Sequence, residues 1–133
     1  MSRTSKHLSL WMAALALTVG GVISAPSASA ASDDDCAVRA SDGRLYCGNA
    51  APAITRLGAY HEAPITGQLE TNYSWFDCWT SGGLHGGGNT TWYHTAADWV
   101  APGYDGWGYV PADWVNTPGS FDANPTARGL RHC

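Results

Sequence analysis

The chain has 133 residues, of which 44% are hydrophobic and 14% are charged, and its 11 acidic and 7 basic side chains give a formal net charge of −4. This balance excludes a large basic face, so duplex nucleic acid and anionic membrane surfaces are poor partners. The length suits one small domain and leaves no room for a separate catalytic domain beside it.

The first 30 residues have the three parts of a secretory signal peptide. Arg3 and Lys6 form a basic start, residues 8–23 are mostly apolar, and residues 28–30 (Ala-Ser-Ala) form a small-residue cleavage site. A membrane anchor is the alternative, but the apolar run is short and no second apolar span follows it. We therefore expect a secreted protein that starts near Ala31, has no membrane span, and keeps all of the acidic side chains.

Four cysteines follow the predicted signal, at Cys36, Cys47, Cys78 and Cys133. An even number in a secreted chain predicts two disulfides, for which three pairings are possible. We favour Cys36–Cys47, which closes a short loop, and Cys78–Cys133, which pins the last residue to the domain. Loop-closure entropy gives about 3 and about 4 kcal/mol for these two bonds. A metal site is the alternative, but the paired C-x₂₋₄-C spacing of zinc sites is missing.

In chain order, the predicted elements are short β-strands separated by Gly, Pro, Asn and Asp. No window of a dozen residues after the signal has helical periodicity. Such a pattern is typical of an all-β protein, either a small barrel or a sandwich. The expected strands are residues 43–47, 69–79, 90–95 and 107–110, and residues 112–115 are long enough for one helical turn.

The strand predicted over residues 69–79 alternates between two kinds of side chain. Phe76 and Cys78 lie on the face that can bury an aromatic ring and a disulfide sulfur, whereas Tyr73, Trp75 and Trp79 lie on the other face. The second face therefore presents three aromatic rings.

Residues 80–89, which contain a Gly-rich Gly-Gly-Leu-His-Gly-Gly-Gly run around His85, join two of these strands. An oxyanion-hole loop of the esterase type would need a Gly-x-Ser-x-Gly nucleophile elbow, which the chain lacks. A phosphate cradle would need a Gly-Lys-Ser/Thr motif and a following helix, which are also missing. We expect a mobile hairpin tip, with His85 as an adjustable contact to a ligand.

Catalysis by a small hydrolase would use His85 or His94 with a reduced Cys78 as the nucleophile. His94 and Asp98 could also orient one another. We favour an oxidised Cys78 and no catalytic residues, and no motif for a metal or another cofactor is found.

Residues 106–115, Gly-Trp-Gly-Tyr-Val-Pro-Ala-Asp-Trp-Val, resemble the C-terminal signature of SH3 domains, in particular the bacterial SH3 domains of secreted and cell-wall proteins. Residues 57–69 are similar to the start of those domains. The resemblance implies a small SH3-like barrel over residues 55–117. Residues 31–54 would be an N-terminal extension and residues 118–133 a C-terminal tail, both tethered by the disulfides.

In this family the SH3 fold holds extended peptides in an aromatic groove, and bacterial members are associated with cell-wall peptides, including glycine-rich cross-bridges. The resemblance places Pro111, Trp114 and Trp92 in that groove. The abundance of aromatic residues independently favours exposed rings for Tyr93 and Tyr109. Four acidic residues are expected on the rim of the groove: Asp77, Asp98, Asp105 and Asp113.

Together these observations predict a secreted, monomeric, non-catalytic module that binds cell-wall peptide. The ligand-binding residues would be His85, Trp92, Tyr93, Tyr109, Pro111 and Trp114. A secreted interaction or inhibitor protein, which binds another extracellular protein, is the first alternative. A small hydrolase is the second.

Overall fold

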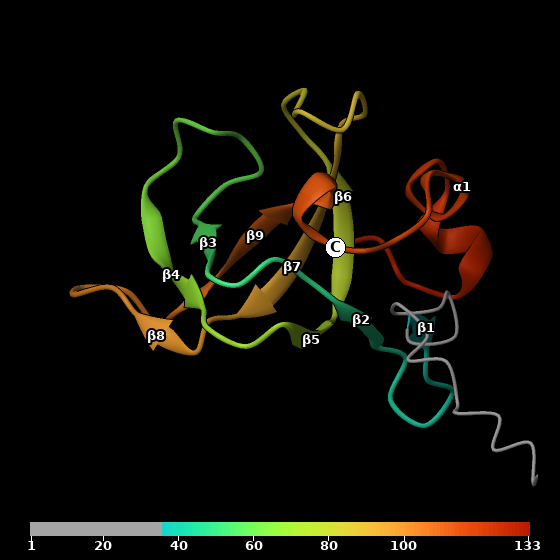
Figure 1. Ribbon diagram of the computed structural model, residues 1–133, viewed down its shortest axis with the longest axis horizontal. Coiled ribbons are helices and arrows are strands. Elements are labelled where there is room, and N and C mark those ends of the chain that lie inside the picture. The colour runs from blue at the N-terminus through green and yellow to red at the C-terminus, as the bar shows by residue number, and fades with distance from the viewer. Residues whose placement is uncertain (1–35) are drawn as a thin grey trace, which may run out of the picture.

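The computed structural model describes residues 36–133, so the predicted signal peptide lies outside the described residues (Figure 1). Residues 36–133 contain nine short strands and three short helical segments. In order they are β1 (Ala37–Val38), β2 (Leu45–Gly48), β3 (Ala53–Arg56), β4 (Ile65–Leu69), β5 (Tyr73–Phe76), β6 (Cys78–Ser81), β7 (Thr91–Ala96), β8 (Trp99–Val100), β9 (Trp107–Pro111), the 3₁₀ helix η2 (Ala112–Trp114), the helix α1 (Gly119–Asp122) and the 3₁₀ helix η3 (Pro125–Arg128).

The strands form two antiparallel sheets. One has three strands in the order β1-β2-β5, and the other has six in the order β6-β7-β9-β3-β4-β8. The predicted strand 69–79 is not continuous: Leu69 ends β4, residues 70–72 connect β4 to β5, and a second break at Asp77 separates β5 from β6. β5 pairs with β2, and β6 pairs with β7. Asp77 still joins the two sheets, because its backbone N–H donates to the carbonyl of His94 at 3.0 Å.

The predicted all-β class is confirmed. Within residues 36–133, however, the six-stranded sheet ends in two different strands, β6 and β8, and does not close into a barrel. β5 is not part of the large sheet, because before the break at Asp77 it pairs with β2. The SH3-like fold and its boundaries at residues 55 and 117 stay predictions.

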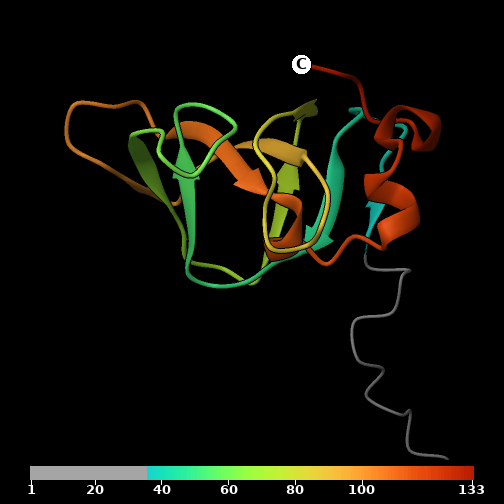
Figure 2. The same ribbon diagram turned by 90° about the horizontal axis from the view of Figure 1, so that it is seen from above.

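One apolar core contains residues from the central segment and from both flanking segments. Leu45 comes from β2, Tyr93 and Val110 come from β7 and β9, and Phe121 and Leu130 come from the C-terminal part of the chain. Figure 2 shows α1 and η3 against the end of the molecule that carries β1 and β2. The flanking segments therefore complete the core that the central strands begin.

Both predicted disulfides are confirmed: the structure pairs Cys36 with Cys47 and Cys78 with Cys133. The second bond holds the chain end along the outer edge of β6 (Figure 1). There the N–H of Trp79 donates to the carbonyl of Arg131 at 3.2 Å, and the N–H of Cys133 donates to the carbonyl of Trp79 at 2.9 Å. The tail thus covers a sheet edge that would otherwise be open to pairing with another chain. None of the helices in residues 36–133 is long and apolar enough to cross a membrane.

Candidate functional site

Tyr93, one of the predicted groove residues, is fully buried in the core. Its ring packs between Phe76 and Phe121, at centroid distances of 5.8 and 6.2 Å. Its hydroxyl donates a hydrogen bond of 2.6 Å to Oδ1 of Asp122. The expected exposure of the Tyr93 ring is therefore wrong, because this side of β7 faces the core and not solvent.

Asp122 is the acceptor at the centre of this buried polar cluster. Burial raises the pKa of Asp122, while hydrogen bonds from Thr117, Tyr93 and Asn89 act in the opposite direction. Burial and the adjacent carboxylate also raise the pKa of Tyr93 far above its usual value. The cluster lies inside the protein and joins β7 to the C-terminal segment, so its role is structural.

Trp92 points to the opposite side of β7 and is also fully buried, because two loops cover it. His61 and His85 contact its ring edge-on, at centroid distances of 5.2 and 5.9 Å. The indole N–H donates to the carbonyl of Gly83 at 2.8 Å. Trp92 is therefore not an exposed ring on which a ligand could stack.

His85 lies inside the glycine-rich loop and is only 5% exposed. Its Nε2 lies 2.9 Å from the carbonyl of Thr91, and its Nδ1 accepts the N–H of Gly87 at 3.1 Å. Nδ1 also lies 3.4 Å from a carboxylate oxygen of Asp113. The predicted adjustable contact is thus a buried side chain that holds the loop over Trp92.

Pro111 and Trp114 do not complete the predicted groove. Pro111 is buried and pairs with Trp92 across the β7–β9 ladder. Trp114 is partly buried and packs against the core. Only Tyr109, of the six predicted contacts, lies in an exposed aromatic surface.

That surface is a row of cross-strand pairs on one side of β7 and β9. His94 pairs with Tyr109, and Ala96 pairs with Trp107, so these side chains project from the same face. The ring of His94 stacks on Trp107, with centroids 5.3 Å apart and planes at 16°. The ring of Tyr109 also contacts this imidazole, with centroids 4.8 Å apart and planes at 54°.

Two further rings, from β5 and β2, extend this row. Trp75 makes an edge contact with Trp107 at 5.7 Å, and Tyr46 is the cross-strand partner of Trp75. We call the five residues Tyr46, Trp75, His94, Trp107 and Tyr109 the aromatic band. Every member is at least partly exposed, and Trp107 is 36% exposed.

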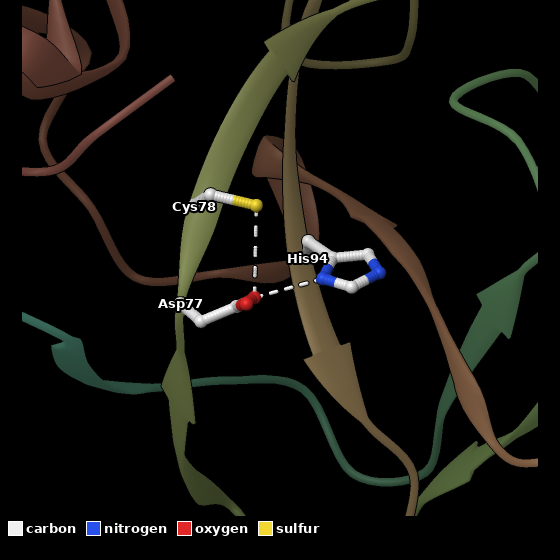
Figure 3. A group of neighbouring side chains, drawn as sticks. All are labelled: Asp77, Cys78 and His94. Carbon is white, nitrogen blue, oxygen red and sulfur yellow. Dashed lines mark hydrogen bonds and ion pairs between the residues drawn. The ribbon is translucent and has the colours of Figure 1, made fainter. Parts of the chain in front are cut away.

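Asp77 orients the histidine of the band (Figure 3). Its Oδ1 lies 2.8 Å from Nδ1 of His94, and its Oδ2 accepts a hydrogen bond of 3.2 Å from Arg131. With Nδ1 engaged by the carboxylate, Nε2 is the ring nitrogen left for other contacts. This partner is Asp77 and not Asp98, whose carboxylate instead accepts the N–H groups of Glu70 and Thr71.

Asp77, Cys78 and His94 place three potential metal-ligand atoms within 4.8 Å of one another. The Sγ of Cys78 is in a disulfide and carries neither a proton nor a charge. The cluster therefore offers one imidazole and one carboxylate, fewer than the three or four protein ligands of a zinc site. The same disulfide removes Cys78 as a nucleophile.

The other predicted rim acids are used within the chain. Asp105 accepts the N–H of Trp107 at 3.1 Å, and Asp113 is the carboxylate beside His85. Asp105 thereby fixes the strand start that carries the most exposed ring of the band.

Sequence analysis did not select Trp75, His94 or Trp107 as ligand contacts. The signal that could have found them is the alternation on residues 91–96 and 107–111, which puts His94, Tyr109 and Trp107 on one face once the two strands are paired. No protein-family model matches the chain, and searches of curated proteins and of solved structures found no match either. The resemblance to bacterial SH3 domains therefore stays a prediction.

Proposed function

We propose that this protein is a secreted, monomeric and non-catalytic module that holds an extracellular ligand on the aromatic band, with cell-wall peptide as the leading candidate. The observation that carries the proposal is the exposure of Trp107 beside Trp75, His94 and Tyr109. Partly exposed rings in contact with one another form an apolar surface with polar edges, which suits contact with peptide groups. The two disulfides support an oxidising compartment.

The rings of the aromatic band are held in fixed positions, and this supports a binding role for the surface. Cross-strand pairing fixes the backbone below His94 and Tyr109, and Asp77 fixes the imidazole. Rings that are already held in place lose little conformational entropy when a ligand binds. The SH3-like resemblance supports a peptide ligand, but the surface that we propose is the aromatic band and not the predicted groove around Trp92.

The test is sedimentation of the oxidised protein with insoluble peptidoglycan. We expect the wild type to pellet and Trp107→Ala to bind at least about tenfold more weakly, since a central aromatic contact carries much of such an affinity. Trp99→Ala is the matched control, because Trp99 is 48% exposed on β8 and outside the band. If Trp99→Ala loses as much binding as Trp107→Ala, or if the wild type stays in solution, the proposal is refuted.

A protein partner is the second candidate function, and the edge strand β8 favours it. This strand is the end of the six-stranded sheet, and both its residues, Trp99 and Val100, are more than 40% exposed. A short apolar edge can accept a strand from another protein. In that case a one-to-one soluble complex would be lost in Trp99→Ala and kept in Trp107→Ala, the reverse of the first outcome.

The hydrolase alternative would need His94 to act as a general base on water, since Cys78 is oxidised. Because Nδ1 of His94 is held by Asp77, Nε2 would be the nitrogen that takes the proton from water. If the wild type releases soluble fragments from peptidoglycan and His94→Ala does not, the protein is an enzyme instead.

A further inference from the structure

The positive charge of the described residues is concentrated beside the aromatic band. Residues 36–133 contain no lysine and five arginines. The guanidinium of Arg39 lies 3.5 Å from the ring centroid of Tyr46, and that of Arg44 lies 4.1 Å from the ring centroid of Trp75. Arg131 binds Asp77, and Arg56 is the cross-strand partner of Tyr109.

The same surface also carries aspartates, since Asp42 accepts the hydroxyl of Tyr46, Asp77 holds His94 and Asp105 accepts the N–H of Trp107. Among the arginines, Arg39 and Arg44 stack on the band and Arg131 pairs with Asp77, whereas Arg56 donates to the carbonyl of Ala63 and Arg128 lies in η3. The cationic part of the surface is therefore its Tyr46–Trp75 end, and a local positive charge attracts anionic ligands there.

Two of these arginines, Arg39 and Arg44, form no ion pair within residues 36–133, and neither guanidinium makes a hydrogen bond to that part of the chain. The nearby carboxylate of Asp42 is already used, because it accepts the hydroxyl of Tyr46 at 2.6 Å and the backbone N–H of Arg44 at 3.0 Å. Asp42 thus holds the backbone of this turn without neutralising the guanidinium groups through direct contact.

The stacked position leaves the hydrogen-bonding part of each guanidinium open. A guanidinium that lies over an aromatic ring uses its face, while its N–H donors point outward in its own plane. That arrangement of donors matches the two oxygens of a carboxylate. Lysine, which would present a single charged point, does not occur here.

We infer that the end of the aromatic band formed by Tyr46 and Trp75 is a carboxylate-binding subsite, in which Arg44 and Arg39 receive the free carboxylates of a bound peptide. This inference rests on the proposed function, in which the band holds the apolar part of the same ligand. The ligand is then an acidic peptide, extended so that one part stacks on Trp107 and a carboxylate reaches Arg44.

The test compares one ligand in two charge states. Soluble stem peptides released from peptidoglycan are used with their carboxylates free, or after coupling to methylamine, which converts the carboxylates to neutral amides. Calorimetric titration of the oxidised protein should give about tenfold tighter binding of the free form, as expected for a charge-assisted hydrogen bond at a partly exposed site. Arg44→Gln should remove most of this preference, and added salt should reduce it in the wild type.

Arg128→Gln is the matched control, because it removes one arginine charge away from the band. Arg44→Gln keeps the backbone N–H that Asp42 accepts, so the turn should still form. If the free and amidated peptides bind equally well, and Trp107→Ala binds neither of them, the carboxylate subsite is overturned. The proposed function would remain, because the aromatic band would still bind the peptide. Equal losses in Arg128→Gln and Arg44→Gln would also overturn the subsite. If neither peptide binds, both proposals fail.

Discussion

Removal of the disulfide between Cys78 and Cys133, by the double substitution Cys78→Ala and Cys133→Ala, should destabilise the protein more than any other change to its cysteines. The bond joins residues 55 positions apart, so loop-closure entropy assigns it about 4 kcal/mol. The bond between Cys36 and Cys47 spans 11 positions and is assigned about 3 kcal/mol. For a domain of this size each kcal/mol corresponds to about 4–8 °C in Tm.

The two double variants are matched controls for each other. Cys47 and Cys78 are both buried, so truncation of either side chain leaves a similar small void. Loss of the bond to Cys133 additionally loosens the tail, which is then held by its hydrogen bonds to Trp79, the ion pair of Arg131 with Asp77 and the ring contact of His132 with Trp79. Urea denaturation without reductant, followed by circular dichroism, measures both free energies of unfolding. A smaller loss for the Cys78–Cys133 pair than for the Cys36–Cys47 pair would refute the reasoning.

Further predictions concern the buried residues of β7 and its loops. Tyr93→Phe should lower the free energy of unfolding by about 2 kcal/mol at neutral pH, because the buried carboxylate of Asp122 loses a donor. Tyr104→Phe, at an exposed ring, should leave the free energy of unfolding unchanged in the same denaturation assay. Burial raises the pKa of Asp122 above 3.8, so the folded protein binds the proton of this carboxyl group more tightly than the unfolded chain does. The contribution of Asp122 to stability therefore falls as the pH rises from 3.8 through the pKa of the folded state. Asp122→Asn should remove this part of the pH dependence, and an unchanged pH profile would contradict the assignment. His85→Ala should expose Trp92, seen as increased acrylamide quenching of its emission, and unchanged quenching would show that His85 does not close the loop.

The features that could be predicted from the sequence are those that local rules determine. The inward position of Phe76 and Cys78 follows from the alternation of side chains along a strand. The sequence allows three disulfide pairings, and the one that we favour, Cys36–Cys47 with Cys78–Cys133, is the one in the structure. The strands at residues 90–95 and 107–110 are rich in β-branched and aromatic side chains, and the structure places β7 and β9 there.

The break at Asp77 between β5 and β6 depends on contacts that are distant in sequence. Asp77 bonds to the backbone and the side chain of His94, and it also bonds to Arg131 from the chain end. Nothing in the neighbouring residues distinguishes this aspartate from one on a solvated strand. Its bend became predictable only after the pairing of β6 with β7 and the path of the tail were known.

The location of the proposed site follows from how far the loops extend over one row of side chains. The pairs Trp92 with Pro111, His94 with Tyr109, and Ala96 with Trp107 lie side by side on the same face of β7 and β9. Alternation predicts this shared face, but it does not say which of the pairs other segments cover. The loops that carry His61 and His85 reach the first pair and bury it, and they stop before the second. The six residues of this row are therefore buried at the Trp92 end and accessible at the Trp107 end. The proposed ligand contacts lie at the accessible end.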